Sequence, residues 1–320
     1  MTPHSFASAL LMLRQEADAL LPPQAPLQDA VTALYACHQT LPPNDTWRDF
    51  SDLTTDGAPL ELAERFGGEA MLGLTLEPRP YAGSESQRFL AAANFATNIC
   101  SDLSSYLAEL APWLRNRLWI GFDGNEQDVY LPLRGDLVVE HLLAAMGVHS
   151  DGEARRALTA HSANGRLNMV ALTLEGGTIC GVTLYLRQVR PHLSAALTFY
   201  PETALCRGYW DDPNTGSAIR LGLDGTLRSE AVYHYTAAYW RTDTALLARL
   251  TDVLARRELP LSSATLLAGL IGIPDHTLHR RMVAVSARPD GAHTRFKLYQ
   301  SAAPYVQHHW SNNTVSTTER

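Results

Sequence analysis

The sequence predicts an α/β fold, in which a ten-stranded antiparallel β-barrel is built from repeated helix–hairpin units and surrounded by a ring of α-helices. Two observations predict it. Hairpin-like stretches recur along the 320 residues, each with a glycine-containing turn between two runs of alternating side chains. Segments with helical spacing separate these stretches. A parallel doubly wound sheet is disfavoured, because it needs single strands between its helices.

The N-terminal part of the chain is the least regular. Residues 1–21 have the spacing of an amphipathic helix and lack the charged start and pure apolar core of a signal peptide. A weak first hairpin is expected near 49–54 and 69–77, with the stretch TTDGAPLELAERF (54–66) in its connection. This stretch presents one carboxylate, Glu61, between two leucines.

Four clearer hairpins follow, and helices separate them. The hairpins are expected at 117–134, 166–187, 218–236 and 282–300. Their turns are Asp123-Gly124, Gly176-Gly177, Asp224-Gly225 and Asp290-Gly291. The helices are expected at 84–114, 136–150, 244–259 and 262–272.

About ten strands close into a barrel too wide for side chains alone to fill, so a ligand chamber is expected. Residues 1–310 form one domain, and the polar tail 311–320 is expected to be disordered.

Composition excludes several classes of function. The net charge of −7 gives no basic footprint for nucleic acid, and no apolar run is long enough to span a membrane. The four cysteines form no C-x-x-C pair, which disfavours a metal or redox motif. We therefore expect a cytoplasmic protein, monomeric or homodimeric. Of the 26 basic residues only Lys297 is a lysine, so anions are handled almost entirely by arginine.

Side chains alternate along strands, and one face of each hairpin carries tyrosine. An isolated strand tyrosine more often serves packing. Tyrosines at equivalent positions of four hairpins instead favour a chamber lined by aromatic rings, which stabilise cations and exclude water from them. The candidate lining residues are Tyr130, Tyr185, Tyr233, Tyr235 and Tyr299.

Three stretches resemble one enzyme family. The first, SDLTTDGAPLELA (51–63), is similar to the family segment "S-x-L-T-x-D-G-x-P-x-E-x-S". The second, LGLTLEP (72–78), is similar to a family strand that ends in "E-P". The third, GFDGNEQDVYLP (121–132), is similar to the family hairpin "G-x-D … K-x-Y". The chain thus resembles the aromatic prenyltransferase (ABBA or PT-barrel) superfamily, and within it the indole, dimethylallyltryptophan synthase-like branch. The resemblance spans roughly residues 48 to 300.

The resemblance implies a reaction. A prenyl diphosphate ionises inside the barrel, tyrosines shield the allylic cation, and an electron-rich aromatic small molecule of secondary metabolism attacks it. Glu61 is implied as the catalytic residue that holds the indole N–H. Without the motif, Glu61 would be read as a solvated loop acid or a helix N-terminal charge. No cofactor is implied; Mg²⁺ use is possible, but no D-D-x-x-D or other motif predicts it. His276 and His279 are expected on a solvated helix face.

The basic positions of the family are only partly present. Gly73 stands where an arginine is expected, Asp128 where a lysine is expected, and Gly181 and Thr183 occupy the corresponding positions before Tyr185. The candidate diphosphate residues are Arg134, Arg187, Arg295 and Lys297. An alternative is therefore open: the barrel has lost diphosphate use, and acts as a cyclase or isomerase through cationic intermediates, or only binds an aromatic ligand.

Overall fold

The computed structural model of the chain describes residues 60–66, 71–77, 84–123, 126–135, 137–163, 165–188, 215–235, 278–287 and 295–302. The strands within these ranges are β1 Leu60–Phe66, β2 Met71–Leu76, β3 Trp119–Asp123, β4 Glu126–Pro132, β5 Gly165–Glu175, β6 Thr178–Gln188, β7 Thr215–Gly222, β8 Leu227–Tyr235, β9 Leu278–Ala287 and β10 Arg295–Ala302. The helices are α3 Glu85–Ile99, α4 Leu103–Leu110, α5 Val139–Ala145 and α6 Gly152–Ser162, with a short 3-10 turn, η2 Ala111–Trp113.

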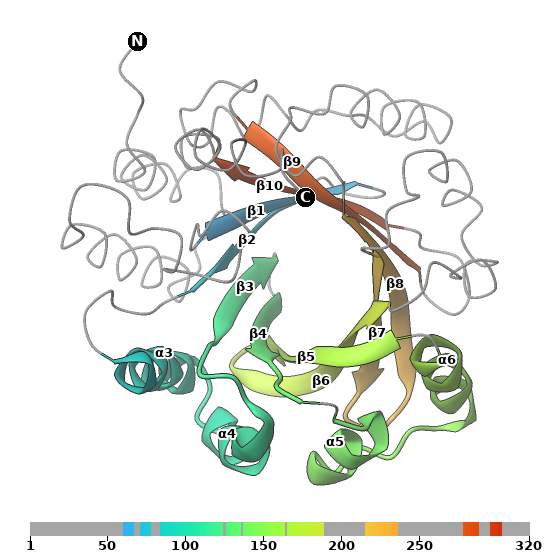
Figure 1. Ribbon diagram of the computed structural model, residues 1–320, viewed down its shortest axis with the longest axis horizontal. Coiled ribbons are helices and arrows are strands. Elements are labelled where there is room, and N and C mark those ends of the chain that lie inside the picture. The colour runs from blue at the N-terminus through green and yellow to red at the C-terminus, as the bar shows by residue number, and fades with distance from the viewer. Residues whose placement is uncertain are drawn as a thin grey trace, which may run out of the picture.

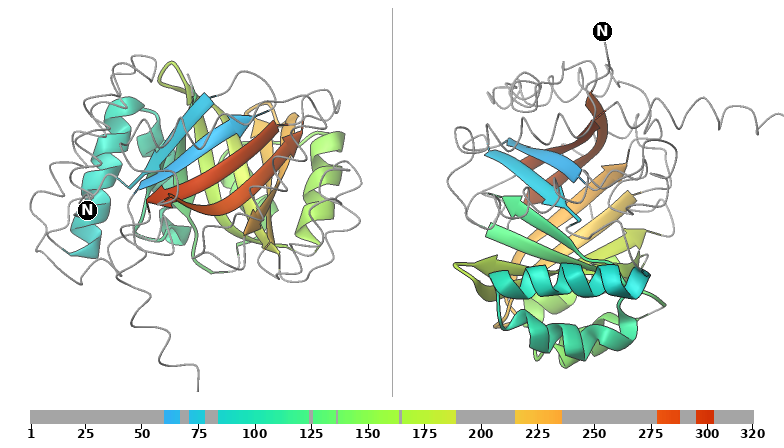
Figure 2. Two further views of the ribbon diagram at one scale, coloured as in Figure 1. Left: turned by 90° about the horizontal axis from the view of Figure 1, so that it is seen from above. Right: turned by 90° about the vertical axis from the view of Figure 1, so that its left-hand side faces the viewer.

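The strands follow one another around a closed barrel in chain order (Figure 1). Each strand pairs antiparallel with the next one, and β1 pairs with β10 to close the ring. The described helices lie outside the barrel wall, beside β3 to β8 (Figures 1 and 2). These elements confirm the predicted α/β class. The helices expected at 1–21, 244–259 and 262–272 lie outside the described residues, as does the tail 311–320.

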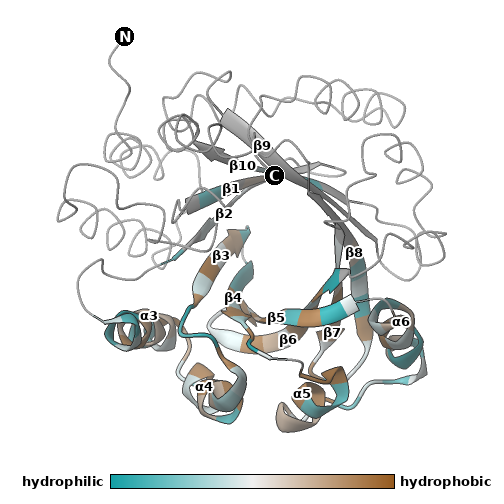
Figure 3. Ribbon diagram, in the orientation of Figure 1, coloured by the Kyte–Doolittle hydropathy of each residue, from teal (hydrophilic) through white to brown (hydrophobic). Residues whose placement is uncertain are grey.

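The hydrophobic core lies between the barrel wall and the helices. Outward-facing residues of the strands, such as Val129, Leu172 and Leu184, are fully buried, and so are Leu103 of α4 and Leu142 of α5. Hydrophobic and hydrophilic residues alternate along β3 to β8 (Figure 3). Because the apolar face of each strand packs outward against the helices, its other face is left to line the barrel interior. No described helix is both long enough and apolar enough to cross a membrane.

Two of the predicted turns are confirmed in detail. Gly176 and Gly177 join β5 to β6 with φ values of 57° and 78°, and Gly225 turns β7 into β8 with φ 80°. Asp224 fixes the second turn, because its Oδ1 accepts hydrogen bonds from the Thr226 N–H at 3.1 Å and the Thr226 hydroxyl at 2.7 Å. The turn Asp290-Gly291 lies outside the described residues.

The first hairpin differs from its prediction. Its strands are β1 and β2, so the stretch 60–66 forms a strand and does not lie in the connection, while 49–54 lies outside the described residues. The reason is the pattern LELAERF, which alternates and pairs on both sides, with β2 and with β10. Glu61 is therefore a strand residue, and the alternative of a loop or helix N-terminal charge is wrong.

The helical predictions also need correction. The segment 84–114 is not one helix, since α3 ends at Ile99 and α4 begins at Leu103. Residues 136–150 contain only the short α5, which stops before Gly147 at φ 69°. A further helix, α6, begins where the Asp151 side chain accepts a hydrogen bond from the Ala154 N–H at 2.7 Å. His279 lies in β9 and not on a helix.

Candidate active site

A pocket opens on the inner face of five neighbouring strands of the barrel, β10, β1, β2, β3 and β4. Most of its lining residues occupy alternate positions on these strands, as the strand period requires. They are Ala63, Gly73, Thr75, Gly121, Phe122, Asp123, Asp128, Tyr130, Lys297 and Tyr299. The lining thus combines aromatic rings with charged groups of both signs.

Glu61 lies beside this pocket on β1. The residue is buried, with 8% of its surface exposed. Glu61 lies on the same face of β1 as the lining residue Ala63, two residues before it. On the neighbouring strand β2, its partner in the register is the lining residue Thr75. A carboxylate buried at this depth requires hydrogen-bond donors.

Three of the five candidate tyrosines have described side chains, and the structure brings them together. Tyr130 and Tyr299 line the pocket, and the Tyr185 ring lies 5.9 Å from the Tyr130 ring, centroid to centroid, at an interplanar angle of 53°. That spacing and tilt are typical of favourable aromatic pairs. For Tyr233 and Tyr235 the backbone gives the register: Tyr235 and Tyr299 both pair with Met282 of β9, from opposite sides.

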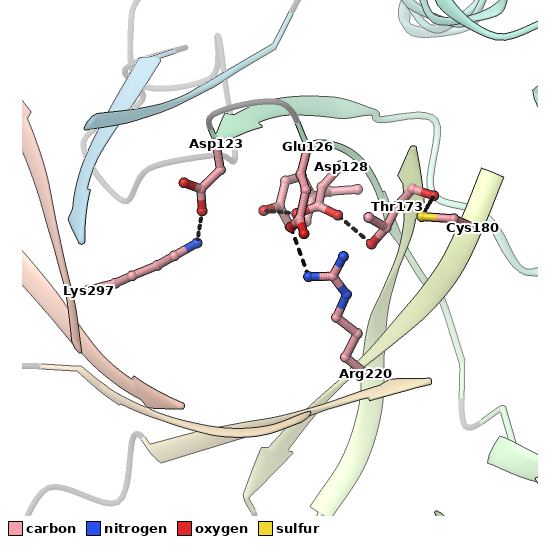
Figure 4. Close-up of polar contacts among 8 residues, drawn as sticks. Asp123, Glu126, Asp128, Thr173, Cys180, Arg220 and Lys297 are labelled. Carbon is pink, nitrogen blue, oxygen red and sulfur yellow. Dashed lines mark hydrogen bonds and ion pairs between the residues drawn. The ribbon is translucent and has the colours of Figure 1, made fainter. Parts of the chain in front are cut away.

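Two ion pairs cross the barrel interior (Figure 4). Lys297 Nζ of β10 contacts Asp123 Oδ2 of β3 at 2.6 Å. Arg220 Nη1 of β7 donates to Glu126 Oε2 of β4 at 2.9 Å. Burial opposes the charge of Arg220, but the hydrogen bond to Glu126 and the nearby Asp128 carboxylate outweigh it and raise the pKa of the guanidinium. Arg220 is therefore a permanent cation inside the barrel.

Asp128 lies between these two pairs, on the same strand as Glu126. Its Oδ1 accepts a hydrogen bond from the Thr173 hydroxyl at 2.7 Å, and the Tyr130 hydroxyl donates to its Oδ2 at 3.4 Å. Burial raises the pKa of the Asp128 carboxyl above its usual range, although Arg220, the Thr173 hydroxyl and Lys297 each act to lower it. This carboxyl is thus a stronger base than an exposed aspartate.

The candidate diphosphate residues are placed unequally. Lys297 lines the pocket. Arg134 and Arg187 are exposed and are not among the lining residues. Arg134 lies beyond the end of β4, where its N–H donates to the Trp113 carbonyl, and Arg187 lies near the end of β6. Arg295 pairs with Ser286 at the start of β10, and its side chain lies outside those described.

Sequence reasoning missed Arg220 and the acids that hold the two cations. The signal was present in the first strand of the third hairpin, where Ala218, Arg220 and Gly222 alternate with apolar residues. The tyrosines themselves lie on the second strand of each hairpin, so they mark the inward face of that strand alone. The same alternation on the first strands selects Asp123 and Thr173 as well.

Two glycines shape the pocket. A Cβ on Gly121 would lie 2.8 Å from Tyr130 Cε2, so the absence of a side chain lets the tyrosine ring lie against β3. Gly73 lines the pocket at the position where the family resemblance implied an arginine. Among the described residues, no group of three or more His, Cys, Asp and Glu side chains is arranged to hold a metal ion.

No protein-family model and no curated protein sequence matches the chain. Solved structures do match: the fold is the aromatic prenyltransferase barrel, as found in tryptophan prenyltransferases. The 5-dimethylallyl tryptophan synthase from Streptomyces coelicolor, solved with DMASPP and Trp, matches with a TM-score of 0.69 at 17% identity over 94% of this chain and 95% of that chain.

Two further structures agree. The 6-dimethylallyltryptophan synthase from Micromonospora olivasterospora matches with a TM-score of 0.68 at 16% identity, over 94% of this chain and 97% of its own. The prenyltransferase PriB, in a ternary complex with L-tryptophan and dimethylallyl thiolodiphosphate, gives a TM-score of 0.67 at 16% identity. The match covers 94% of this chain and 96% of the PriB chain. At such identities the agreement concerns the fold.

Proposed function

We propose that the chain is an aromatic, indole-type prenyltransferase, which moves an allylic group from a prenyl diphosphate to an electron-rich aromatic small molecule of secondary metabolism. One observation carries the proposal: a pocket inside a barrel of the tryptophan prenyltransferase fold is lined by tyrosines and by Lys297. Such a pocket provides a cation for the leaving group and aromatic faces for the allylic cation.

Glu61 is proposed to bind the acceptor. Its buried carboxylate lies next to the pocket wall formed by Ala63 and Thr75. An indole N–H is a donor that such a carboxylate would bind and polarise, which makes the ring more nucleophilic.

The tyrosines are proposed to shield the allylic cation. Tyr130 and Tyr299 face the pocket and Tyr185 packs against Tyr130. Aromatic faces attract cations and keep water away from a reactive carbocation. Tyr233 and Tyr235 belong to the same proposal through their register on β8.

The diphosphate is proposed to bind Lys297 and Arg220 inside the barrel, together with Arg295, which lies two residues before Lys297 on β10. A diphosphate leaving group requires several charge-assisted hydrogen bonds. Both internal cations now contact carboxylates, Asp123 and Glu126, so the diphosphate has to displace these contacts or share them. Arg134 and Arg187 are the proposed alternatives at the exposed rim. Alanine variants of each pair distinguish the two locations by their effect on pyrophosphate affinity.

The proposal extends to the whole chain. Residues 1–310 are proposed to form one domain with the complete ring of helices around the ten-stranded barrel. We further propose a cytoplasmic enzyme, monomeric or homodimeric, that needs no metal. Turnover that is unchanged by a chelator would support the last point, and turnover restored only by added Mg²⁺ would contradict it.

Product analysis after incubation with dimethylallyl diphosphate and a panel of indoles, tryptophan included, tests the proposal. We expect a prenylated indole from the wild-type protein, and a fall in its formation of about 100-fold or more in Glu61→Gln, since the carboxylate polarises the acceptor. Glu140→Gln, which changes an exposed glutamate of α5, is the control and should match wild type. A Glu61→Gln protein that turns over as fast as wild type would remove the role of Glu61.

A further inference from the structure

We infer that the Asp128 carboxylate removes the ring proton from the acceptor after the new carbon–carbon bond has formed. This inference rests on the proposed prenyl transfer and assigns its last chemical step. Asp128 lines the pocket, and it is held there by two hydroxyl groups (Figure 4).

The chemistry requires a proton acceptor at this point. The allylic C–O bond breaks and its electron pair leaves with the diphosphate. A ring carbon then uses a π pair to bond the allylic carbon, which leaves that ring carbon with its hydrogen and the ring with a positive charge. When the C–H bond breaks, its electron pair restores the aromatic ring and the proton passes to Asp128 Oδ2. The sequence is redox-neutral and needs no further reactant.

The geometry leaves one oxygen of Asp128 for this task. Oδ1 is anchored by the Thr173 hydroxyl at 2.7 Å. Oδ2 lies 3.4 Å from the Tyr130 hydroxyl, on the wall where the tyrosines would hold the allylic cation. Since Tyr130 also lines the pocket, a ring stacked at this wall brings its reacting carbon close to Oδ2. A base has to lie within hydrogen-bond reach of the proton that it takes.

The other ionisable groups of the lining are less suited. Asp123 is already engaged by a cation, since its Oδ2 contacts Lys297 Nζ at 2.6 Å. Lys297, as an ammonium, has no lone pair to accept a proton. The hydroxyl of Tyr130 is the donor in its contact with Asp128, and phenols are ordinarily weak bases. Glu126 is not among the residues that line the pocket, and it holds Arg220.

The surroundings of Asp128 favour proton uptake. Burial raises the pKa of its carboxyl, and the Glu126 carboxylate on the same strand acts in the same direction. Arg220 of β7 and Lys297 of β10 oppose this, and the Cys180 thiol of β6 faces the same cluster. Because the base works when deprotonated, turnover should fall as the pH drops through this raised pKa, at a higher pH than for an ordinary carboxyl.

The Asp128→Asn variant tests the assignment, since it keeps the shape and a hydrogen-bond acceptor for Thr173. We expect it to ionise dimethylallyl diphosphate still, and to release the allylic alcohol, while prenylated indole falls by about 100-fold or more. Deuterium at the reacting ring carbon should slow the residual prenylation, because proton removal has become limiting. Asp102→Asn, at an exposed aspartate before α4, is the control and should behave as wild type.

Three outcomes would overturn the assignment. One is product formation in Asp128→Asn within about threefold of wild type, since a general base contributes about 100-fold or more; the departing diphosphate would then be the base. Another is loss of acceptor binding by calorimetry, which would mean a structural role. Should Asp128→Asn not fold, Asp128→Glu carries the test, and an unmoved acid limb of its pH profile would overturn the assignment. Absence of prenylated indole from the wild type itself contradicts the proposed function instead.

Discussion

At the scale of single residues, the described part of the barrel interior holds two pairs of opposite charges. Lys297, the only lysine of the chain, contacts Asp123, and Arg220 contacts Glu126. Each internal cation thus already has a carboxylate partner. Removing one member of such a pair leaves the other charge poorly solvated, so these side chains depend on one another.

The Tyr130 ring depends on a glycine. In Gly121→Ala the new Cβ would lie 2.8 Å from Tyr130 Cε2 and 3.2 Å from its hydroxyl oxygen, so the ring has to move. Since the ring packs on Tyr185 and its hydroxyl contacts Asp128, we expect kcat/KM for prenyl transfer to fall by about tenfold or more, with little change in Tm. Gly152→Ala, where only Arg156 Nη1 comes within 4 Å, is the control. Activity equal to wild type in Gly121→Ala would show that the position of this ring is unimportant.

At the scale of elements, the hairpins could be predicted because their signals are local. Glycine turns and alternation place β3 to β8 close to their observed bounds. The bounds of the first hairpin differ from the prediction because the alternation in LELAERF is short and directly follows a turn-rich stretch. The break between α3 and α4 was missed because residues 84–114 are helix-forming throughout, and the packing that divides them is not local.

The turn between β7 and β8 supports the start of α6. Gly225 has φ 80°, and its carbonyl accepts a hydrogen bond from the Asp151 N–H at 3.2 Å. In Gly225→Ala the Cβ would overlap the His149 carbonyl. We expect the free energy of unfolding to fall by about 3 kcal/mol or more, since backbone strain and overlap add. Chemical denaturation of the variant and of the wild type measures this loss of stability.

The matched control for this turn is Gly176→Ala. Gly176, on the β5–β6 turn, also has a positive φ, 57°, but nothing lies within 4 Å of the point that an alanine Cβ would occupy there. Gly176→Ala should therefore lower the free energy of unfolding by only about 1 kcal/mol. Equal losses in the two variants would mean that the contact with His149 contributes nothing.

At the scale of the whole molecule, barrel closure brings together residues that no local pattern connects. Lys297 meets Asp123 because β1 pairs with both β10 and β2, and β2 pairs with β3. The inward positions of Tyr130 and Tyr299 could be predicted from alternation within each hairpin. Which acid contacts which cation could not, because it depends on the stagger of strands around the ring. Arg134 and Arg187 follow Tyr130 and Tyr185 at the even spacing that would place them on the same face of a strand, yet both arginines are exposed.

Diphosphate binding separates the proposed transferase from a barrel that has lost diphosphate use, since both would keep the fold and the aromatic pocket. Calorimetric titration with dimethylallyl thiolodiphosphate measures it directly. We predict one saturable site, weakened by about tenfold or more in Lys297→Ala and in Arg220→Ala, because each removes a charge-assisted contact. Arg228→Ala, at an exposed arginine after the β7–β8 turn, should leave it unchanged. No heat from the wild-type protein, and no competition by pyrophosphate, would contradict the proposed transfer.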